Sequence, residues 1–335
     1  MTLKDIAALA GVSVVTVSNV INGNHKKVSQ KTIDKVNKII EENDFHVNAT
    51  ARSLAKKKSN IIGVVIPYLD AGDIFSQSPY YTEIMAYLEN YIRNNGYYMM
   101  MRSVGTCKEA IPLFSTWNVD GVIFLGAHRD EIMEILPKIK FPAVFIDSYA
   151  DDLNIVNIGI DDFKSGYLAA RYIIGKGHKA IAWAGPDYND PGVINERFRG
   201  FTQALLENDI DFDESSCFVA DTFYDQGVKL GGQIAVADKE FTAVITQSDI
   251  LALGIMEGLR KFGIRIPEDI SIIGFDNIPA CMYSYPQLTS ISQSIRDKAK
   301  IASESLLAMI ENKEVNSDIP KVDVEVVERQ SVKQI

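Results

Sequence analysis

Residues 5–18 read DIAALAGVSVVTVS, which is the pattern of two short helices joined by a tight turn. Gly11 occupies the turn, where a residue that tolerates positive φ is required. The segment leaves little room for a packed core of its own. Its spacing does place the second helix where it is able to enter a DNA major groove. This stretch constrains the fold of the N-terminal region more than any other part of the chain.

Three helices are predicted in the first 45 residues. Thr2 caps the first helix, and Asp5 three residues later gives a capping-box pattern with a carboxylate near the helix N-terminus. Ser13 caps the second helix and Ser29 caps the third. The residues expected to face inward at helical spacing are Ile6, Ala7, Leu9 and Ala10 in the first helix, Val17 with Val20 or Ile21 in the second, and Ile33, Val36, Ile39 and Ile40 in the third.

The second helix presents an exposed edge that suits DNA. Val14 and Val15 suit thymine methyl groups, and Asn19 suits adenine. Thr16 and Ser18 suit hydrogen bonds to phosphates or base edges. The alternative is three ordinary surface helices, in which two exposed valines would be poorly placed without a partner. We therefore predict a DNA contact made by Thr2, Ser13, Val14, Val15, Thr16, Ser18, Asn19 and Asn22.

Charge divides the chain near residue 60. The first 60 residues hold ten Lys and Arg against five Asp and Glu, whereas the remainder holds 24 against 39. A basic head on an acidic body is typical of a protein that contacts nucleic acid through one part and is repelled from phosphate elsewhere. The net charge of −10 for the whole chain therefore misleads about partners.

The segment Asn48–Ala55, NATARSLA, follows the three helices. Its eight residues make about two helical turns, too few for a stable isolated helix in water, so it would be ordered only when something packs on it. Leu54 has no evident core to join. Two interpretations stay open: a leucine that inserts into a minor groove, or a linker with an incidental leucine. The connector residues assigned to DNA are Asn48, Arg52, Leu54 and Ala55.

From Ile61 onward, short apolar runs alternate with amphipathic helical stretches. This alternation favours parallel sheets with helices on both faces, and the length favours two subdomains. The predicted strands are Ile61–Pro67, Tyr97–Val104, Gly121–Gly126, Ala143–Asp147, Lys179–Ala184, Cys217–Ala220, Ala243–Thr246 and Ser271–Phe275. The predicted helices between them are Tyr81–Asn94, Phe163–Gly175, Glu196–Glu207 and Ile250–Phe262.

Polar and aromatic residues follow the ends of these predicted strands. In open parallel sheets, ligands bind beyond the carboxyl ends of the strands. Carboxylates and an arginine that hydrogen-bond hydroxyls, with rings that stack on an apolar sugar face, make a workable saccharide site. A cap or turn role is an equal alternative for any single residue, but convergence on one edge favours a site. The predicted effector residues are Tyr80, Tyr81, Asp147, Arg197, Phe223, Ser248 and Asp276.

Several classes of protein are disfavoured by what the sequence lacks. No GxGxxG or Walker loop follows a strand and no GxSxG elbow is present, so a nucleotide-dependent enzyme has little support. The four histidines lack ligand spacing, so we expect no metal and no cofactor. The chain starts without an n-region or h-region, and no apolar run approaches ~18 residues. We therefore expect a cytoplasmic location rather than a secreted sugar-binding protein. The cysteines, odd in number and expected to be unpaired buried hydrophobes, are Cys107, Cys217 and Cys281.

Two segments, TLKDIAALAGVSVVTVSNVING and NATARSLAKKKSNIIGVVIP, resemble the LacI-type family of bacterial transcription regulators. The resemblance covers the whole chain. It implies an all-α helix-turn-helix head, a hinge helix, and an α/β core of two Rossmann-like lobes joined by three crossing strands, as in type I periplasmic sugar-binding proteins. The implied domains are 1–47, 48–60 and 61–335, with lobe 1 at about 61–160 and 291–320 and lobe 2 at about 161–290 and 321–330.

The resemblance also implies roles for individual positions. Val14, Val15 and Asn19 fall on base-reading positions, and Leu54 falls on the leucine that paired hinge helices lever into a palindromic operator. Positions that contact the effector match Arg197 with Gly200, and Asp276. Two departures are Ser248, where many members have asparagine, and Val47, where proline is usual.

Together these features predict a homodimeric repressor of carbohydrate-use genes that binds palindromic operator DNA. A sugar between the lobes would select one lobe orientation, and thereby decide whether residues 48–55 fold, with a coupling of ~1–3 kcal/mol. A nucleoside or purine, or a phosphorylated partner protein, is the alternative signal. A non-regulatory sugar-binding protein fits less well. The lack of leucine heptads after Arg329 predicts a dimer rather than a tetramer.

Overall fold

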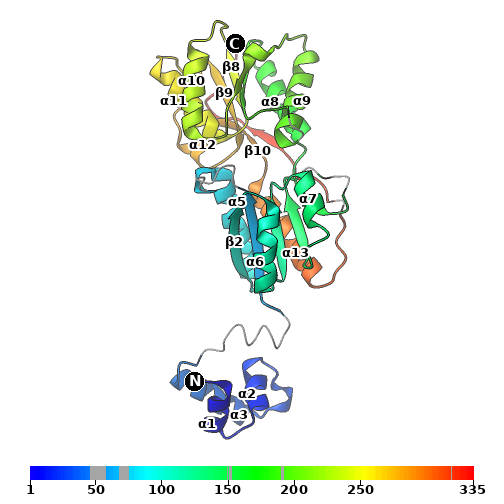
Figure 1. Cartoon of the computed structure of the whole chain (residues 1–335). Coiled ribbons are helices and arrows are strands. Elements are labelled where there is room, and N and C mark those ends of the chain that lie inside the picture. Colours follow the sequence, from blue (N-terminus) through cyan, green and yellow to red (C-terminus); the bar gives the residue numbers. More distant parts are fainter. Residues whose placement is uncertain (46–57, 68–74, 149, 151–152, 190–191, 318) are drawn as a thin grey trace. The chain divides into compact units, whose positions relative to one another are not determined.

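The computed structural model describes residues 1–45, 58–67, 75–148, 150, 153–189, 192–317 and 319–335 (Figure 1). Contacts divide the chain into two units, Met1–Ser59 and Asn60–Ile335. We call them the head and the core. The connector Asn48–Ala55 lies outside the described residues, so the hinge helix stays a prediction.

Helix caps fix the fold of the head. Its elements are α1 (Leu3–Ala10), α2 (Val14–Ile21), the 3-10 turn η1 (His25–Lys27) and α3 (Gln30–Glu42). The Thr2 hydroxyl accepts from the Asp5 amide, and the Asp5 carboxylate accepts from the Thr2 amide. Ser13 and Ser29 cap α2 and α3 in the same way, through backbone amides three residues on. Gly11 ends α1 with a φ of 65°, so each predicted cap and the predicted turn are confirmed.

One predicted core residue of the head is wrong. The side chain of Leu9 is 55% exposed, while Ile6, Ala7 and Ala10 are buried. At about 100° per residue, Leu9 lies roughly 105° from the centre of the face that these three residues form. The buried core of the head consists of Ile6, Ala7, Ala10, Val17, Val20, Ile33 and Val36, with Ile21, Ile39 and Ile40 packed against it.

Within the described ranges, no single helix is both long and apolar enough to cross a membrane. Only α1 and α2 taken together reach that length and composition, and they are bent by 105° relative to each other.

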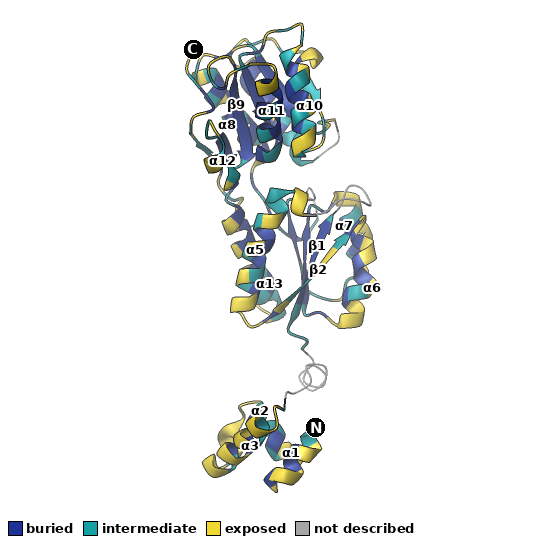
Figure 2. Cartoon of the chain, turned by 90° about the vertical axis from the view of Figure 1, so that its left-hand side faces the viewer, coloured by how far each residue is buried: buried dark blue, intermediate teal, exposed yellow. Residues whose placement is uncertain are grey.

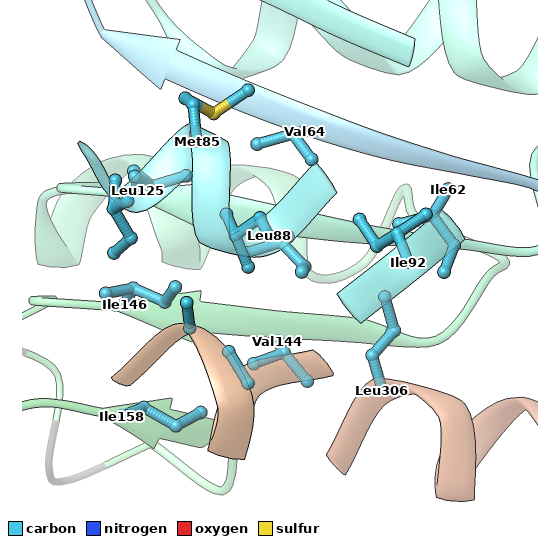
Figure 3. Packing of buried hydrophobic residues seen from close by; sticks show 14 of the residues in the cluster. Ile62, Val64, Met85, Leu88, Ile92, Leu125, Val144, Ile146, Ile158 and Leu306 are labelled. Atoms are coloured by element: carbon cyan, nitrogen blue, oxygen red, sulfur yellow. The ribbon is translucent and has the colours of Figure 1, made fainter. Parts of the chain in front are cut away.

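The first lobe of the core is a parallel sheet with helices on both faces. Its strands lie in the order β2-β1-β3-β4-β5. Their bounds are β1 (Ile61–Pro67), β2 (Tyr98–Val104), β3 (Gly121–Leu125), β4 (Ala143–Ile146) and β5 (Val156–Ile158). Helices α5 (Pro79–Asn94) and α13 (Ile295–Ile310) cover one face, and α6 (Cys107–Trp117) and α7 (Arg129–Ile135) cover the other. Figure 3 shows apolar side chains from α5, α13 and the strands packed in one layer.

The second lobe repeats this plan around a sheet in the order β11-β10-β9-β8-β6-β7. Only β11 runs antiparallel to its neighbour. The strands are β6 (Ile181–Gly185), β7 (Cys217–Val219), β8 (Ala243–Thr246), β9 (Ser271–Asp276), β10 (Thr289–Ser292) and β11 (Glu325–Val327). One face carries α8 (Asp162–Gly175) and α9 (Val193–Leu206); the other carries α10 (Tyr224–Ala235), α11 (Asp249–Lys261) and α12 (Ala280–Tyr283). The remaining turns are η2 (Phe75–Gln77) and η3 (Glu214–Ser216). Figure 2 shows buried strands between helices with exposed outer faces.

Along the described ranges of the core, the chain passes between the two lobes three times. The first passage follows β5, the second lies between β10 and α13, and the third precedes β11. Ile160 and Val322 form an isolated parallel bridge between the first and third passages. Because the strands of both sheets end near these passages, side chains at the strand ends of one lobe face those of the other.

Gly200 brings the backbone of α9 into contact with that of α8. A Cβ on Gly200 would lie 1.9 Å from the Phe163 carbonyl oxygen, so the two helices would have to separate. We expect Gly200→Ala to lower the free energy of unfolding by about 3 kcal/mol through overpacking. Gly175→Ala, at the end of α8 with no atom within 4 Å, is the matched control. Urea denaturation measures both, and equal midpoints would contradict this packing role.

Candidate DNA-contacting edge and ligand cleft

The exposed edge of α2 is dominated by two apolar side chains. Val15 is 68% exposed and Val14 is 39% exposed. Thr16, Ser18 and Asn19 are half-buried rather than fully exposed, so the predicted polar part of the edge is less open than expected. The valines are therefore the most accessible feature of this helix.

The polar residues assigned to DNA in the head also serve the helix ends. Thr2 caps α1, and the Ser13 hydroxyl lies 2.9 Å from that of Thr16. The Asn22 amide donates to the Ser18 carbonyl at 2.8 Å. These hydrogen bonds stabilise the ends of α1 and α2. The DNA contacts of the same residues stay a prediction. The four connector residues, Asn48, Arg52, Leu54 and Ala55, lie outside the described residues.

The two lobes border a cleft of about 540 Å³. Phe223, a predicted effector residue, does not line the cleft. It is the residue directly before α10, and Asp221 and Thr222, which precede it, line the cleft instead. The other predicted effector residues all line it: Tyr80, Tyr81, Asp147, Arg197, Ser248 and Asp276.

Asp147 follows β4 and faces the cleft with both carboxylate oxygens in use. The Tyr80 hydroxyl donates to one oxygen, and the Lys298 ammonium lies 2.5 Å from the other. The backbone of Asp147 has a φ of 54°, a conformation that aspartate tolerates better than most residues. Burial raises the pKa of Tyr80 and Tyr81, so both phenols stay protonated as donors.

Asp276 ends β9 and lies on the opposite side of the cleft. Its backbone has a φ of 111°, and the Gln293 side-chain amide donates to its Oδ1 atom. Burial raises the pKa of Asp276 well above its ordinary value, and the nearby carboxylate of Asp249 raises it further. Asp249 itself accepts from the Ser290 hydroxyl at 2.6 Å and from the Ile278 amide at 2.9 Å. The buried carboxyl group of Asp249 and the half-buried one of Asp276 therefore interact near the end of β9.

Arg197 is the one arginine among the described residues that line the cleft, and three groups contact it. Its Nε atom donates to the buried carboxylate of Asp162 at 2.8 Å. The guanidinium lies over the ring of Phe275 at 3.5 Å from the centroid, and it also donates to the Gln247 carbonyl at 3.4 Å. Its positive charge is thus largely balanced within the protein.

Carboxylates outnumber guanidinium and ammonium groups among the described residues that line the cleft. The carboxylates are Asp147, Asp187, Asp221 and Asp276, against the single guanidinium of Arg197. Arg197 is paired with Asp162 and Asp147 is paired with Lys298, and the raised pKa of Asp276 favours its neutral form. The negative charge that a ligand meets therefore comes mainly from Asp187 and Asp221. Such a surface favours hydroxyl or other N–H and O–H donors, and it disfavours anions.

Sequence reasoning missed Lys298, Gln293, Gln247 and Asp162. A signal for Lys298 was present, because it follows Ile295 and precedes Ala302 at the spacing of the apolar face of α13. A lysine on such a face is buried only when it has a partner. Gln293 carries no comparable signal, since its importance comes from its place between the lobes. Cys217 also differs from its expectation, because it is only half-buried.

The acid pair makes a prediction about pH. Burial raises the pKa of Asp249 from its ordinary 3.8 to about 6, so the folded state holds a proton that the unfolded state releases. Between about pH 4 and pH 6 the free energy of unfolding should therefore fall as the pH rises. We expect Asp249→Asn to remove part of this fall, because asparagine has no carboxyl group to titrate. Urea denaturation at several pH values tests this, with exposed Asp209→Asn as the control; an unchanged slope would contradict it.

Comparison with known proteins agrees with this geometry. Residues 2–48 match the family described as bacterial regulatory proteins, lacI family, and residues 170–332 match the periplasmic binding protein-like domain. The HTH-type transcriptional repressor PurR of Vibrio atlanticus (strain LGP32) is 34% identical over 99% of this chain and 98% of its own. The HTH-type transcriptional regulator MalR of Clostridium butyricum is 34% identical over 99% of each chain.

Two solved structures share the three-dimensional fold of this chain. The lac repressor dimer bound to operator and the anti-inducer ONPF has a TM-score of 0.88 at 26% identity, with 99% of each chain covered. A LacI family regulator from Enterococcus faecium with bound ribose has a TM-score of 0.72 at 27% identity, covering 82% of this chain and 99% of its own. The chain therefore belongs to the lacI family of bacterial regulatory proteins, and it is a DNA-binding transcriptional regulator rather than an enzyme.

Proposed function

We propose that this regulator is a repressor of carbohydrate-use genes whose operator affinity is set by a neutral, hydroxyl-rich effector in the cleft. The observation that carries the proposal is the excess of carboxylate acceptors around a cleft of about 540 Å³, a volume that suits a small sugar. Hydroxyl groups donate to Asp147 and Asp276. A phosphate would face the same carboxylates with Arg197 already committed to Asp162.

Aromatic rings support the same class of ligand. Tyr80 and Tyr81 have ring centroids 5.6 Å apart and both line the cleft. Rings beside carboxylates suit a sugar, which has an apolar C–H face and polar edges. The structural neighbour with bound ribose belongs to the same fold, which is consistent with this assignment.

We infer that two copies act together on DNA. A two-fold axis would present two α2 helices to the half-sites of a palindrome. The similar lac repressor structure is a dimer on its operator. On this proposal Val14, Val15 and Asn19 contact bases, and Asn48, Arg52, Leu54 and Ala55 form the hinge contact. A protein that binds the chromosome works in the cytoplasm.

The effector class is tested with the full-length chain by thermal shift. The panel contains ribose, glucose, maltose and cellobiose, with glucose 6-phosphate and hypoxanthine as the competing classes. A ligand at about 100 times its Kd adds about 2.7 kcal/mol to the apparent stability. We expect a neutral sugar to raise the Tm and to change operator affinity. Shifts from only the phosphate or the purine would overturn the neutral-sugar assignment.

Val15 provides the test of base contact. We expect Val15→Ala to reduce the preference for the operator over a scrambled duplex by about 10-fold, because a contact to a base edge is worth roughly 1–3 kcal/mol. Affinity for the scrambled duplex should not change. Fluorescence anisotropy with an operator selected from a random pool measures both, and Leu9→Ala on α1 is the control. An equal loss on both duplexes would mean that Val15 does not read bases.

A further inference from the structure

Lys298 is a lysine with a fully buried side chain, at 0% exposure. It lies on α13 among apolar neighbours of the first lobe, which include Ala299 and Ala302. Moving an ammonium group out of water is costly unless it is paired and hydrogen-bonded. The groups that pair with the ammonium of Lys298 therefore determine whether it is stable in this buried position.

Three groups surround the ammonium of Lys298. Its Nζ atom lies 2.5 Å from Oδ1 of Asp147, and it also donates to Oε1 of Gln293. The ring centroid of Tyr80 lies 5.5 Å away, within the range of a cation–π contact. Lys298 thus holds a cleft carboxylate and an amide at the same time.

The amide that Lys298 holds lies between the lobes. Gln293 follows β10 of the second lobe directly and precedes α13 of the first. The side-chain NH2 group of Gln293 donates to the carboxylate of Asp276 at the end of β9. The hydrogen bonds therefore form one path from Tyr80 and Asp147 in the first lobe, through Lys298 and Gln293, to Asp276 in the second. We call this path the interlobe chain.

We propose that Lys298 is a positioning residue that sets the resting arrangement of the two lobes, and that the effector acts by breaking the interlobe chain. This inference rests on the proposed function, because both carboxylates of the chain line the proposed effector cleft. A ligand hydroxyl that donates to Asp147 competes with the Tyr80 hydroxyl, and one that donates to Asp276 competes with the Gln293 amide. The second exchange breaks a hydrogen bond of Gln293, which lies in the second passage between the lobes. The first exchange acts through Asp147, the carboxylate that Lys298 holds.

The test measures the distance between the lobes in the full-length chain without ligand. Spin labels are attached in a Cys217→Ser background through Met133→Cys in the first lobe and Val236→Cys in the second, two exposed positions outside the cleft lining. We expect Lys298→Met to shift the electron–electron distance and to broaden its distribution roughly twofold, because one arrangement is no longer selected. Lys300→Met, exposed on the same helix, is the matched control.

Lys298→Met alone leaves the half-buried carboxylate of Asp147 without its cation, so this variant is able to lose stability. Asp147→Asn with Lys298→Met removes both charges together and keeps that result interpretable. If this double variant folds with the same melting temperature as the parent and still shows the altered distance, Lys298 positions the lobes. A distance distribution equal to the parent in the double variant, or in a folded Lys298→Met, would overturn the proposal.

A second measurement separates this inference from the proposed function. In Lys298→Met, which keeps Asp147, the sugar found by the thermal-shift panel should still bind, while its effect on operator affinity falls by about 10-fold. The double variant lacks a proposed ligand contact, so only its interlobe distance is compared with the parent. An unchanged effect on operator affinity would overturn the role of Lys298. A parent chain that responds to none of the sugars would instead overturn the neutral-sugar effector, and the spin-label distances would still decide the role of Lys298.

Discussion

Replacing Arg197 with methionine is expected to lower the free energy of unfolding of the core by about 3 kcal/mol. The substitution takes the guanidinium from a carboxylate, Asp162, whose side chain is only 4% exposed. Removing one partner of a buried ion pair typically costs 3–5 kcal/mol, because the remaining charge stays in a low-dielectric site. The contact over the Phe275 ring is lost as well. Methionine preserves most of the apolar volume, so the loss reports on the charge.

The matched control for Arg197 lies on the same helix. Arg199→Met removes an arginine whose side chain is 61% exposed and pairs with Glu196 at the surface. Surface ion pairs contribute about 0–1 kcal/mol, so this variant should unfold close to the parent. Adding Asp162→Asn to Arg197→Met should recover part of the stability, because the buried charge is then gone. Urea denaturation at pH 7 measures all three, and similar midpoints for the two arginine variants would contradict the buried-pair role.

Sequence periodicity predicted the strands that form the middle of each sheet. β1 and β8 have the predicted bounds, because both are apolar runs buried on two faces. β10 reads TSIS and was missed. Thr289 and Ser290 are fully buried in this strand, because their hydroxyl groups hydrogen-bond to groups elsewhere in the fold, such as Asp249. The hydropathy of the sequence does not indicate this burial. Polar buried strands are therefore visible only once the fold is known.

The candidate cleft was predictable to the extent that it follows from strand ends. Asp147, Ser248 and Asp276 each follow or end a parallel strand, and the rule about carboxyl ends places such residues at one edge. The rule says nothing of the groups that hold them. Lys298 and Asp147 are 151 positions apart in the chain, and only the packing of α13 against the first sheet brings their side chains together. Burial of charge is a tertiary property, and sequence patterns detect only one partner at a time.

Asp276→Asn is expected to weaken binding of the effector by about 100-fold while leaving DNA binding intact. Asparagine is the appropriate substitution, because the φ of 111° at this position would strain alanine. The asparagine oxygen is able to keep the hydrogen bond from Gln293. Its NH2 group then replaces the second carboxylate oxygen, so a ligand hydroxyl meets a donor instead of a charged acceptor. Hydrogen bonds to charged groups contribute about 1.5–3 kcal/mol, which corresponds to the expected loss.

Stability should move in the opposite direction to binding in this variant. Burial and the neighbouring Asp249 raise the pKa of Asp276, so a neutral side chain relieves repulsion at pH 7. The parent should therefore be no more stable than Asp276→Asn, and a loss of binding would not reflect unfolding. Titration calorimetry with the sugar from the panel gives the affinity, and anisotropy gives operator binding. Asp238→Ala, an exposed acid of the same lobe, is the control. If Asp276→Asn binds the sugar with the affinity of the parent, the effector does not contact this carboxylate. The ligand would then not compete with the Gln293 amide for Asp276.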